Sequence, residues 1–410
     1  MKTAAKDFSI NRICVSAHGA AAALVNPSLP HTGLALPILD YEWGGVNQYD
    51  KEYSALRPQF NDSYSPNLPL GLNLGRQLYW LSKKHPTEFN AATYILPLAQ
   101  YWTWRLCGVA ANEVSTMGCH TDLWHPKRND YSSLVYSQNW QWKFPPLDPA
   151  WKVLGNINPA ISDETGISRN CSVMTGAHDS NASFAQFLKL DKNECEALVS
   201  TGTWAITLKR NGNLNDLDEH LDMLANVDVT GEPVCCARFM GGREYEEICL
   251  KFGSGLNDTC SLEDIQGTID DNVLALPDFS NGSGPFVGRA PQIMGTPKSA
   301  VALATLYAAL MIDFELDLLK VSGAVIIEGS FVKNDFICSL VASLRPEQEI
   351  KTLNNDDGVT QGCLSLATWE QTKSSPPNTM HCHALELNNL FLYRNLWRKL
   401  CENEKDLQHA

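Results

Sequence analysis

A polar cluster stands between two apolar segments in residues 171–190, CSVMTGAHDSNASFAQFLKL. This order predicts a buried strand, a turn and then a helix. Asp179 or Ser180 is a candidate N-cap of that helix, because a short side-chain oxygen accepts hydrogen bonds from the unpaired first-turn amides. A cap does not need His178 beside it, so a catalytic role for the pair is a second interpretation of the same residues.

Two later segments also place a glycine where a buried strand ends, VSTGTWAI at 199–206 and VIIEGSFVKNDFICSL at 325–340. In the first, Thr201, Gly202 and Thr203 form a small hydroxyl-rich turn that suits phosphate oxygens, although a plain hairpin turn has the same composition. In the second, Gly329 precedes a helix predicted to begin near Asn334. Ligands of open α/β sheets bind beyond such strand ends. Neither a P-loop nor a GxGxxG motif is present.

The composition is that of a folded protein, and the chain is longer than a domain with a single hydrophobic core usually is. The chain has 410 residues, of which 44% are hydrophobic and 19% charged, and its formal net charge is −14. Two domains are therefore expected. The negative charge opposes binding to nucleic acid or to anionic lipid. The absence of a long apolar run and of a secretory leader predicts a cytoplasmic protein without a membrane span.

The thirteen cysteines are scattered and form no CxxC pair. In a long intracellular chain they are best interpreted as small buried side chains. Three groups resemble metal ligands, but none has the spacing of a structural zinc site, so no metal site is predicted from them. These groups are CHTDLWH at 119–125, the pair at 235–236, and HCH at 381–383.

The order of segments predicts an α/β architecture, because strand-like and helix-like patterns alternate along the chain. Strands are expected over 13–17 and 23–26, and helical stretches over 68–86 and 96–108. A charged stretch at 190–196 suggests a boundary between domains at 1–194 and 195–410. The second domain is expected to begin with a hairpin, and to contain a helix over 299–320, a strand over 324–329 and a helix from 362.

Taken together, the motifs resemble those of FGGY carbohydrate kinases. The resemblance spans nearly all of residues 10–368 and is carried by VSAHGAAAALVN at 15–26, GLNLGRQLYWL at 71–81, LAQYWTWRLCG at 98–108, GAHDSNAS at 176–183, VSTGTW at 199–204, EGSFVKNDFICSLVASL at 328–344 and GCLSLA at 362–367. The HDS and GTW forms look most like the rhamnulokinase and fuculokinase side. The resemblance implies the two-domain actin-like ATPase (RNase H-like) fold. It implies ATP and Mg²⁺ as cofactors, a small-molecule sugar as substrate, no nucleic-acid or membrane partner, and room for a homodimer.

The resemblance also implies roles for individual residues. Asp179 would be the general base that takes the proton of the attacking sugar hydroxyl. The sugar would be lined by His18, Gly19, His178 and Ser180. Thr201, Gly202 and Thr203 would face the ATP phosphates, and Gly329, Asn334 and Gly362 would lie along the adenosine.

Three features depart from the family pattern. The first recognisable motif is His18-Gly19, so the first domain is expected to be truncated at its N-terminus, without the acidic strand and glycine turn that hold magnesium and phosphate. The segment CCARFMGGREYE at 235–246 lacks clear counterparts of the Asn and Gln of rhamnulokinases, and EGS at 328–330 replaces a usual second glycine. An inactive sugar-binding or scaffold protein and a filament-forming actin-like ATPase are therefore the alternatives to a sugar kinase.

Overall fold

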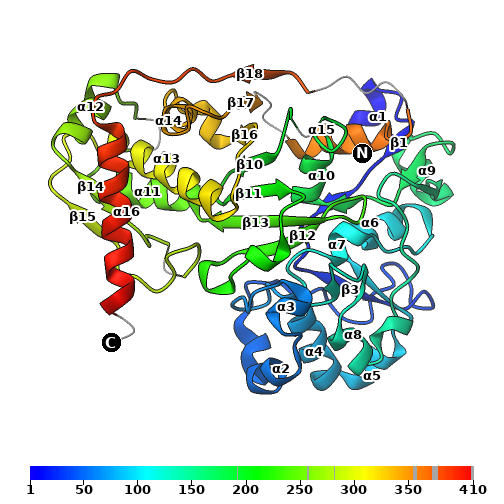
Figure 1. Cartoon of the computed structure of the whole chain (residues 1–410). Coiled ribbons are helices and arrows are strands. Elements are labelled where there is room, and N and C mark those ends of the chain that lie inside the picture. Colours follow the sequence, from blue (N-terminus) through cyan, green and yellow to red (C-terminus); the bar gives the residue numbers. More distant parts are fainter. Residues whose placement is uncertain (192, 256–257, 281, 354–357, 372–376, 408–410) are drawn as a thin grey trace.

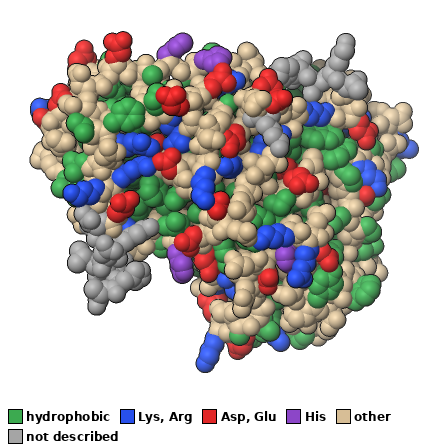
Figure 2. Space-filling view, in the orientation of Figure 1, with side chains coloured by type: hydrophobic (Ala, Val, Ile, Leu, Met, Phe, Trp, Pro, Cys, Tyr) green, Lys and Arg blue, Asp and Glu red, His purple; other side chains and the backbone are tan. Residues whose placement is uncertain are grey.

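The computed structural model describes residues 1–191, 193–255, 258–280, 282–353, 358–371 and 377–407. They form two lobes, one built mainly from the first half of the chain and one from the second (Figure 1). On the face shown in Figure 2, acidic and basic side chains are interspersed. Within these ranges, no helix is both long enough and apolar enough to cross a membrane.

A mixed sheet forms the centre of the second lobe. Its described strands number seven and lie in the order β12-β13-β11-β10-β16-β17-β18. The predicted hairpin is confirmed as β10 and β11, and β10 also pairs in parallel with β16, which confirms the predicted strand. The bounds are β10 Ala197–Thr201, β11 Ala205–Arg210, β12 Leu224–Val227, β13 Pro233–Phe239, β16 Val325–Gly329, β17 Ile350–Leu353 and β18 Thr379–His381.

Helix α13 (Ala300–Leu318) is the central helix of the second lobe and confirms the prediction over 299–320. It begins where predicted because the Ser299 side chain accepts a hydrogen bond from the Ala302 amide. It is apolar on most sides, so it lies buried between other elements. Those elements include α11 Gly241–Lys251, α12 Leu262–Asp270 and α14 Ile337–Leu344, with the small pair β14 Leu274–Leu276 and β15 Gln292–Met294 nearby.

One fully buried carboxylate holds α13, α14 and the C-terminal helix α16 (Leu390–Leu407) together. Asp313 of α13 pairs with Arg345 at 3.0 Å, Arg394 at 2.6 Å and Arg398 at 2.5 Å. Three guanidinium groups compensate the cost of burying this charge, and they fix the position of α16 across the lobe.

The first lobe has smaller sheets. β8 (Ser172–Met174) pairs in parallel with β1 (Arg12–Ile13) and antiparallel with β7 (Val153–Asn156). The strand predicted over 13–17 is interrupted, because β2 (Ser16–Ala17) pairs separately with β9 (Ala177–His178). Among the described residues, β1 and β2 each have a strand partner on one side only.

The remaining elements of the first lobe surround these strands. β3 (Ala22–Val25) pairs with β4 (Tyr94–Pro97), and the predicted helices are confirmed as α4 (Leu74–Lys84) and α6 (Leu98–Cys107). The shorter elements are α1 Ala4–Asp7, α2 Asp50–Leu56, α3 Phe60–Ser63, α5 Pro86–Ala91, α7 Val114–Met117, β5 Trp124–His125, β6 Asp130–Tyr131, α8 Ser133–Ser137 and α9 Pro159–Thr165. The domain boundary at residue 194 stays a prediction.

Two helices far apart in the sequence cross where the lobes meet. These are α10 (Asp179–Ala185) and α15 (Gly358–Ala367), which includes the helix predicted from residue 362. The backbones approach so closely that a Cβ on Gly362 would overlap the carbonyl of Ala182. Glycine is therefore required at 362 by packing.

Candidate active site

Asp179 is the first residue of α10 and follows β9 directly. The expectation that Asp179 or Ser180 is the N-cap is wrong, because His178 has that position and no side chain caps the helix. Asp179 Oδ1 accepts from the adjacent Ser180 amide at 2.7 Å. The Asp179 side chain keeps 40% of its surface exposed, so its carboxylate is open to a ligand.

His178 is buried and orients the carboxylate next to it. Its Nε2 lies 3.2 Å from Asp179 Oδ1, and its Nδ1 lies 3.1 Å from the side-chain amide of Asn181. Because the Asn181 Nδ2 group donates, also to the Ser115 carbonyl at 3.4 Å, the hydrogen-bond network assigns the ring proton to His178 Nε2. His178 then donates to Asp179.

The electrostatic surroundings of Asp179 keep its carboxylate ionised. Burial opposes its ionisation, but His178, the Ser180 amide, His18 and His120 outweigh that effect and hold the pKa of Asp179 below its usual value. Burial lowers the pKa of His178, and it lowers the pKa of His120 to about 3. At neutral pH the Asp179 carboxylate is therefore ionised, and the His178 and His120 rings beside it are uncharged.

The two predicted residues of the first motif lie beside this group. Gly19 is buried, and a Cβ there would overlap the Cys119 sulfur and come within 3.2 Å of the His178 ring. His18 makes an edge contact with the ring of Tyr41 at 5.3 Å, and its Nδ1 is buried without a hydrogen-bond partner. A buried polar atom without a partner marks a position where a bound ligand would complete the hydrogen bonding. The structure thus brings together His18, Gly19, His178, Asp179 and Ser180.

Glu113 is linked to His178 through helix α7. Its fully buried carboxylate accepts from the amides of Ser115 and Thr116 at 3.0 and 2.9 Å, and so caps α7. The Ser115 hydroxyl in turn accepts from the His178 amide at 3.4 Å. Burial raises the pKa of Glu113 to about 7, against the effect of these hydrogen bonds.

This pKa predicts a pH dependence of stability. Because native Glu113 holds its proton more tightly than unfolded Glu113, the free energy of unfolding should fall as pH rises from 4.5 to 7. The contribution of Glu113 to this fall is about 3 kcal/mol. Urea unfolding at several pH values should show the fall in the parent and a smaller fall in Glu113→Gln. Equal slopes in the two proteins would contradict the assignment.

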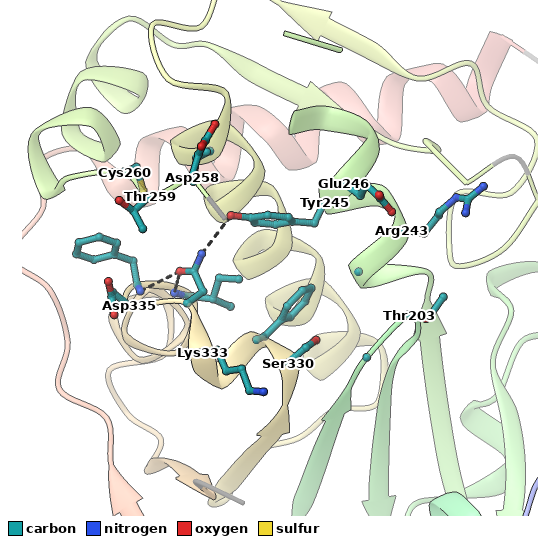
Figure 3. A pocket seen from close by; sticks show the side chains of 17 residues that line it. Thr203, Arg243, Tyr245, Glu246, Asp258, Thr259, Cys260, Ser330, Lys333 and Asp335 are labelled. Atoms are coloured by element: carbon teal, nitrogen blue, oxygen red, sulfur yellow. Dashed lines mark hydrogen bonds between the residues drawn. The ribbon is translucent and has the colours of Figure 1, made fainter. Parts of the chain in front are cut away.

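In the second lobe, the turn between β10 and β11 forms a wall of a cavity of about 630 Å³ (Figure 3). Gly202 and Thr203 line it from one side, and Ser330, Lys333 and Asn334 line it from the segment after β16. Tyr245 and Arg243 come from α11, and in Figure 3 the Tyr245 side chain points into the cavity, whereas Arg243 points away from Tyr245. Sequence analysis predicted three of the lining residues, namely Gly202, Thr203 and Asn334.

Thr201 and Gly329 do not line this cavity. The Thr201 hydroxyl donates to the Glu328 carbonyl at 2.5 Å and accepts from the Phe331 amide at 3.0 Å, so it joins β10 to the turn after β16. Gly329 has a φ of 90°, and a Cβ there would overlap the Thr201 carbonyl. The two residues hold the strand ends together, and the ligand roles that the resemblance implies for them stay predictions.

Both the nitrogen and the oxygen of the Asn334 side-chain amide form hydrogen bonds. Its Nδ2 donates to Thr305 at 3.2 Å, and its Oδ1 accepts from the amides of Phe336 and Ile337 at 3.0 and 3.1 Å. Helix α14 therefore begins at Ile337, three residues later than predicted. Gly362 lies at the α10–α15 crossing, where the packing leaves no room for a side chain, and it does not line this cavity. The place along the adenosine that the resemblance implies for it stays a prediction.

A second cavity of about 730 Å³ lies between the lobes. Residues 57, 66–69 and 72 line it from the first lobe, and Trp204, Asp222 and Arg238 line it from the second. Arg238 is held by Asp222 at 3.0 Å and lies over the Trp204 ring at 4.8 Å. The turn at 202–204 thus separates the two cavities, with Thr203 on one and Trp204 on the other.

Sequence analysis missed His120, Tyr41 and Arg238. His120 interacts electrostatically with Asp179 of the first lobe and Arg238 of the second, so it lies between α10 and the interlobe cavity. Its motif, CHTDLWH, was considered only for metal binding. Among the described residues, no group of three or more His, Cys, Asp or Glu side chains is placed to hold a metal ion.

Two α/β lobes with a cavity between them form the actin-like ATPase class of fold, which confirms the predicted two-domain fold, and the predicted truncation of the first domain stays a prediction. Comparison with family models gives a match to the FGGY family of carbohydrate kinases, N-terminal domain, over residues 70–185. The model of carbohydrate kinase FGGY, C-terminal domain, matches residues 193–376. Comparison with curated proteins gives no match.

Solved structures agree with the family models. A carbohydrate kinase from Novosphingobium aromaticivorans is 34% identical, with a TM-score of 0.85 over 98% of this chain and 88% of that one. The chain belongs to the FGGY family of carbohydrate kinases. A xylulose kinase from Lactobacillus acidophilus, 14% identical, has a TM-score of 0.80 over 100% of this chain and 87% of that one. A gluconate kinase from the same organism, 13% identical, has a TM-score of 0.77 over 100% and 86%. These last two show the fold alone.

Proposed function

We propose that this protein is an ATP-dependent sugar kinase that phosphorylates a primary hydroxyl of a ketose such as rhamnulose, fuculose or xylulose, with Asp179 as general base. The observation that carries the proposal is an ionised, partly exposed carboxylate at a helix start, held by a neutral histidine and adjoined by His18 and His120. A carboxylate of this kind has no packing or capping role to explain it. The family membership gives it a chemical one.

Each residue near Asp179 would have a defined task. Asp179 takes the proton of the sugar hydroxyl as that oxygen is phosphorylated, and His178 keeps the carboxylate oriented through its Nε2–H group. The buried Nδ1 of His18 accepts from a second sugar hydroxyl. Tyr41 and His120 complete a polar wall that fixes the sugar relative to the base.

The cavity behind Thr203 fits a nucleotide in size and character. Its volume of about 630 Å³ is within the range of small-molecule sites. Lys333 and Arg243 supply positive charge on its rim, and Tyr245 and Phe331 supply aromatic surface. ATP bound there would supply the phosphoryl group. The Gly202-Thr203 turn would direct its terminal phosphates toward the interlobe cavity, because this turn separates the two.

Mg²⁺ is part of the proposal as the companion of ATP. Magnesium in such sites is held by substrate phosphates, waters and one or two carboxylates, so it needs no cage of protein ligands. Asp179, whose side chain is partly exposed, is the carboxylate that would face this ion in the proposed complex. The Mg²⁺ ion would neutralise negative charge on the phosphate oxygens.

A coupled assay of ADP release tests the function directly. The parent protein is assayed with ATP, Mg²⁺ and a panel containing rhamnulose, fuculose, xylulose, gluconate and glycerol. A sugar-dependent release with one ketose preferred is the expected result. Calorimetric binding of a sugar without any release would favour the inactive sugar-binding alternative.

Substitutions at two neighbouring threonines should have different effects. Thr203→Val removes a hydroxyl that faces the nucleotide cavity, so the KM for ATP should rise about tenfold while the melting temperature stays unchanged. Thr201→Val removes a hydroxyl bonded to two backbone groups, so it should lower the free energy of unfolding by about 1–3 kcal/mol. The measurements are steady-state kinetics and urea unfolding. A normal KM in Thr203→Val would place the phosphates elsewhere.

A further inference from the structure

Two arginine side chains, one from each lobe, line the interlobe cavity of about 730 Å³. Arg57 directly follows α2 in the first lobe, and Arg238 lies on β13 of the second. Their side chains keep only 11% and 9% of their surfaces exposed. A buried guanidinium group is costly unless it is paired, so each of the two needs a partner in the protein.

The partner of each arginine is a buried aspartate, and the geometry is the same in both pairs. Asp122 accepts from Nε and Nη2 of Arg57 at 3.1 Å each, and Asp222 accepts from Nε and Nη2 of Arg238 at 3.1 and 3.0 Å. Two parallel hydrogen bonds fix the plane of a guanidinium group. Among the described residues, the third nitrogen, Nη1, has no hydrogen-bond partner in either arginine. Each arginine therefore keeps the donors of one nitrogen for a ligand.

The two aspartates are occupied by further donors as well. Asp122 Oδ2 also accepts from the Tyr53 hydroxyl at 2.7 Å, and Asp222 Oδ2 also accepts from the Gly284 amide at 2.9 Å. The groups that the two ion pairs offer to a ligand are therefore N–H donors rather than carboxylate oxygens. Guanidinium N–H groups match the oxygens of an oxyanion such as phosphate.

On the side of the second lobe, the interlobe cavity adjoins the turn of the nucleotide cavity. Its wall includes Trp204, and the Arg238 guanidinium lies over the Trp204 ring at 4.8 Å. Trp204 directly follows Thr203, which lines the nucleotide cavity. Arg238 is therefore held close to the turn that separates the two cavities.

On the side of the first lobe, hydrogen bonds connect the cavity wall to the histidines around Asp179. The amide of Leu68, a wall residue, donates to Asn73 Oδ1 at 2.8 Å, and Asn73 Nδ2 donates to the His120 carbonyl at 3.1 Å. The centroid of the His120 ring lies 6.3 Å from that of the His178 ring, and His178 contacts Asp179. The cavity thus lies between the nucleotide turn and the proposed base.

We propose that the interlobe cavity is an oxyanion site in which Arg57 and Arg238 together bind a phosphoryl group. A phosphoryl group has enough oxygens to accept from both arginines, and because each arginine belongs to a different lobe, the bound group would join the lobes. The place of the cavity between the nucleotide turn and Asp179 identifies this group as the one that is transferred. That identification rests on the proposed function, whereas the binding of an oxyanion does not.

The two aspartates give this site its fixed geometry. Because Asp122 and Asp222 hold the guanidinium groups in place before a ligand arrives, the arginines can stabilise negative charge on the phosphoryl oxygens without reorganising. Arg57 and Arg238 would contact the phosphoryl group, and the aspartates would be positioning residues that act through them.

Equilibrium dialysis of the full chain against radiolabelled inorganic phosphate tests the site without nucleotide or sugar. Arg57→Lys and Arg238→Lys each keep a positive charge beside the aspartate, but lysine has one nitrogen and cannot both hold the carboxylate in this way and bind a ligand as arginine does. The Kd for phosphate should rise at least tenfold in each variant. Because a site between the lobes needs both arginines, an unchanged Kd in either variant would overturn the proposal, as would a parent protein that binds no phosphate at millimolar concentrations.

Asn67→Asp tests the cavity without altering either ion pair. Asn67 lines the cavity, and its Oδ1 accepts from Arg76 Nη2 at 2.6 Å, a hydrogen bond that a carboxylate oxygen would keep. The added negative charge should raise the Kd for phosphate about fivefold at low ionic strength. This variant decides the question even if a lysine variant does not fold, since phosphate binding equal to that of the parent would contradict an oxyanion site here.

Arg394→Lys is the matched control. Arg394 also holds an aspartate through Nε and Nη2, at 2.6 and 2.9 Å from the oxygens of Asp313, but it lines neither of the two cavities. Its Kd for phosphate should equal that of the parent. A loss of binding as large as in Arg238→Lys would show that breaking any such pair is enough, and the cavity would then not be the site.

Competition identifies the source of the oxyanion. Unlabelled phosphate should displace the label, and gluconate, which carries a carboxylate, should displace it at least tenfold less effectively. Stronger displacement by gluconate would assign the arginines to the carboxylate of a substrate and would overturn the phosphoryl assignment. Because the assay needs no turnover, phosphate binding by a protein that releases no ADP with any sugar would refute the proposed function and leave the oxyanion site in place.

Discussion

Asp179→Asn is expected to lower kcat about 1000-fold while leaving sugar affinity within about threefold of the parent value. General-base catalysis typically contributes 100- to 10,000-fold, and asparagine keeps the size of the side chain but has no basic oxygen. His178 can still donate to the amide oxygen, so the local geometry should persist. The measurements are steady-state ADP release and calorimetric sugar titration.

The control for this prediction is Asp163→Asn. Asp163 lies on α9 in an exposed ion pair with Arg169, so the substitution removes the same charge from the same lobe without touching the site. Its kcat should equal that of the parent. If Asp179→Asn kept more than a tenth of the parent turnover, another group would have to be the base, and the role given to the 178–179 pair would be wrong.

The local order of elements could be predicted from the sequence because the signals are local. Ser299 and the apolar run after it set the start of α13, and the glycine-containing turn at 202 follows a buried strand whose hairpin partner comes immediately after it. The pairing of His178 with Asp179 is also visible, since the two residues are adjacent. These features depend on neighbours a few residues apart.

The remaining features depend on contacts between distant segments. The role of Thr201 is set by the Glu328 carbonyl and the Phe331 amide, and no local pattern records that partnership. His120 reaches Asp179 from a loop between α7 and β5, where its motif suggests a metal instead. A glycine can be required because a ligand lies beside it or because a backbone carbonyl does. The sequence shows the same residue in both cases, so it does not distinguish them.

Gly362 shows the difference most clearly, and Gly362→Val is expected to impair both folding and catalysis. Its Cβ would overlap the Ala182 carbonyl and come within 2.9 Å of the Ser183 amide, and these are backbone atoms that cannot rotate away. α15 must therefore move away from α10. The free energy of unfolding should fall by about 3 kcal/mol, as for severe overpacking.

The Gly362→Val protein should lose more activity than the decrease in its folded fraction explains. α10 carries Asp179 at its first position, so a shift of this helix displaces the base from the sugar. A displacement of about 1 Å typically costs about 100-fold in rate, and kcat should decrease by that factor in the fraction of protein that remains folded. Urea unfolding and ADP release measured on the same sample separate the two effects.

Gly267→Ala provides the matched control. Gly267 is also inside a helix, α12, but nothing lies within 4 Å of the position that its Cβ would occupy. Alanine there should raise the free energy of unfolding by about 0.5–1 kcal/mol through helix propensity and leave kcat unchanged. A Gly362→Val protein with the stability and turnover of the parent would show that α10 and α15 can separate without consequence. The crossing would then not be what holds Asp179 in place.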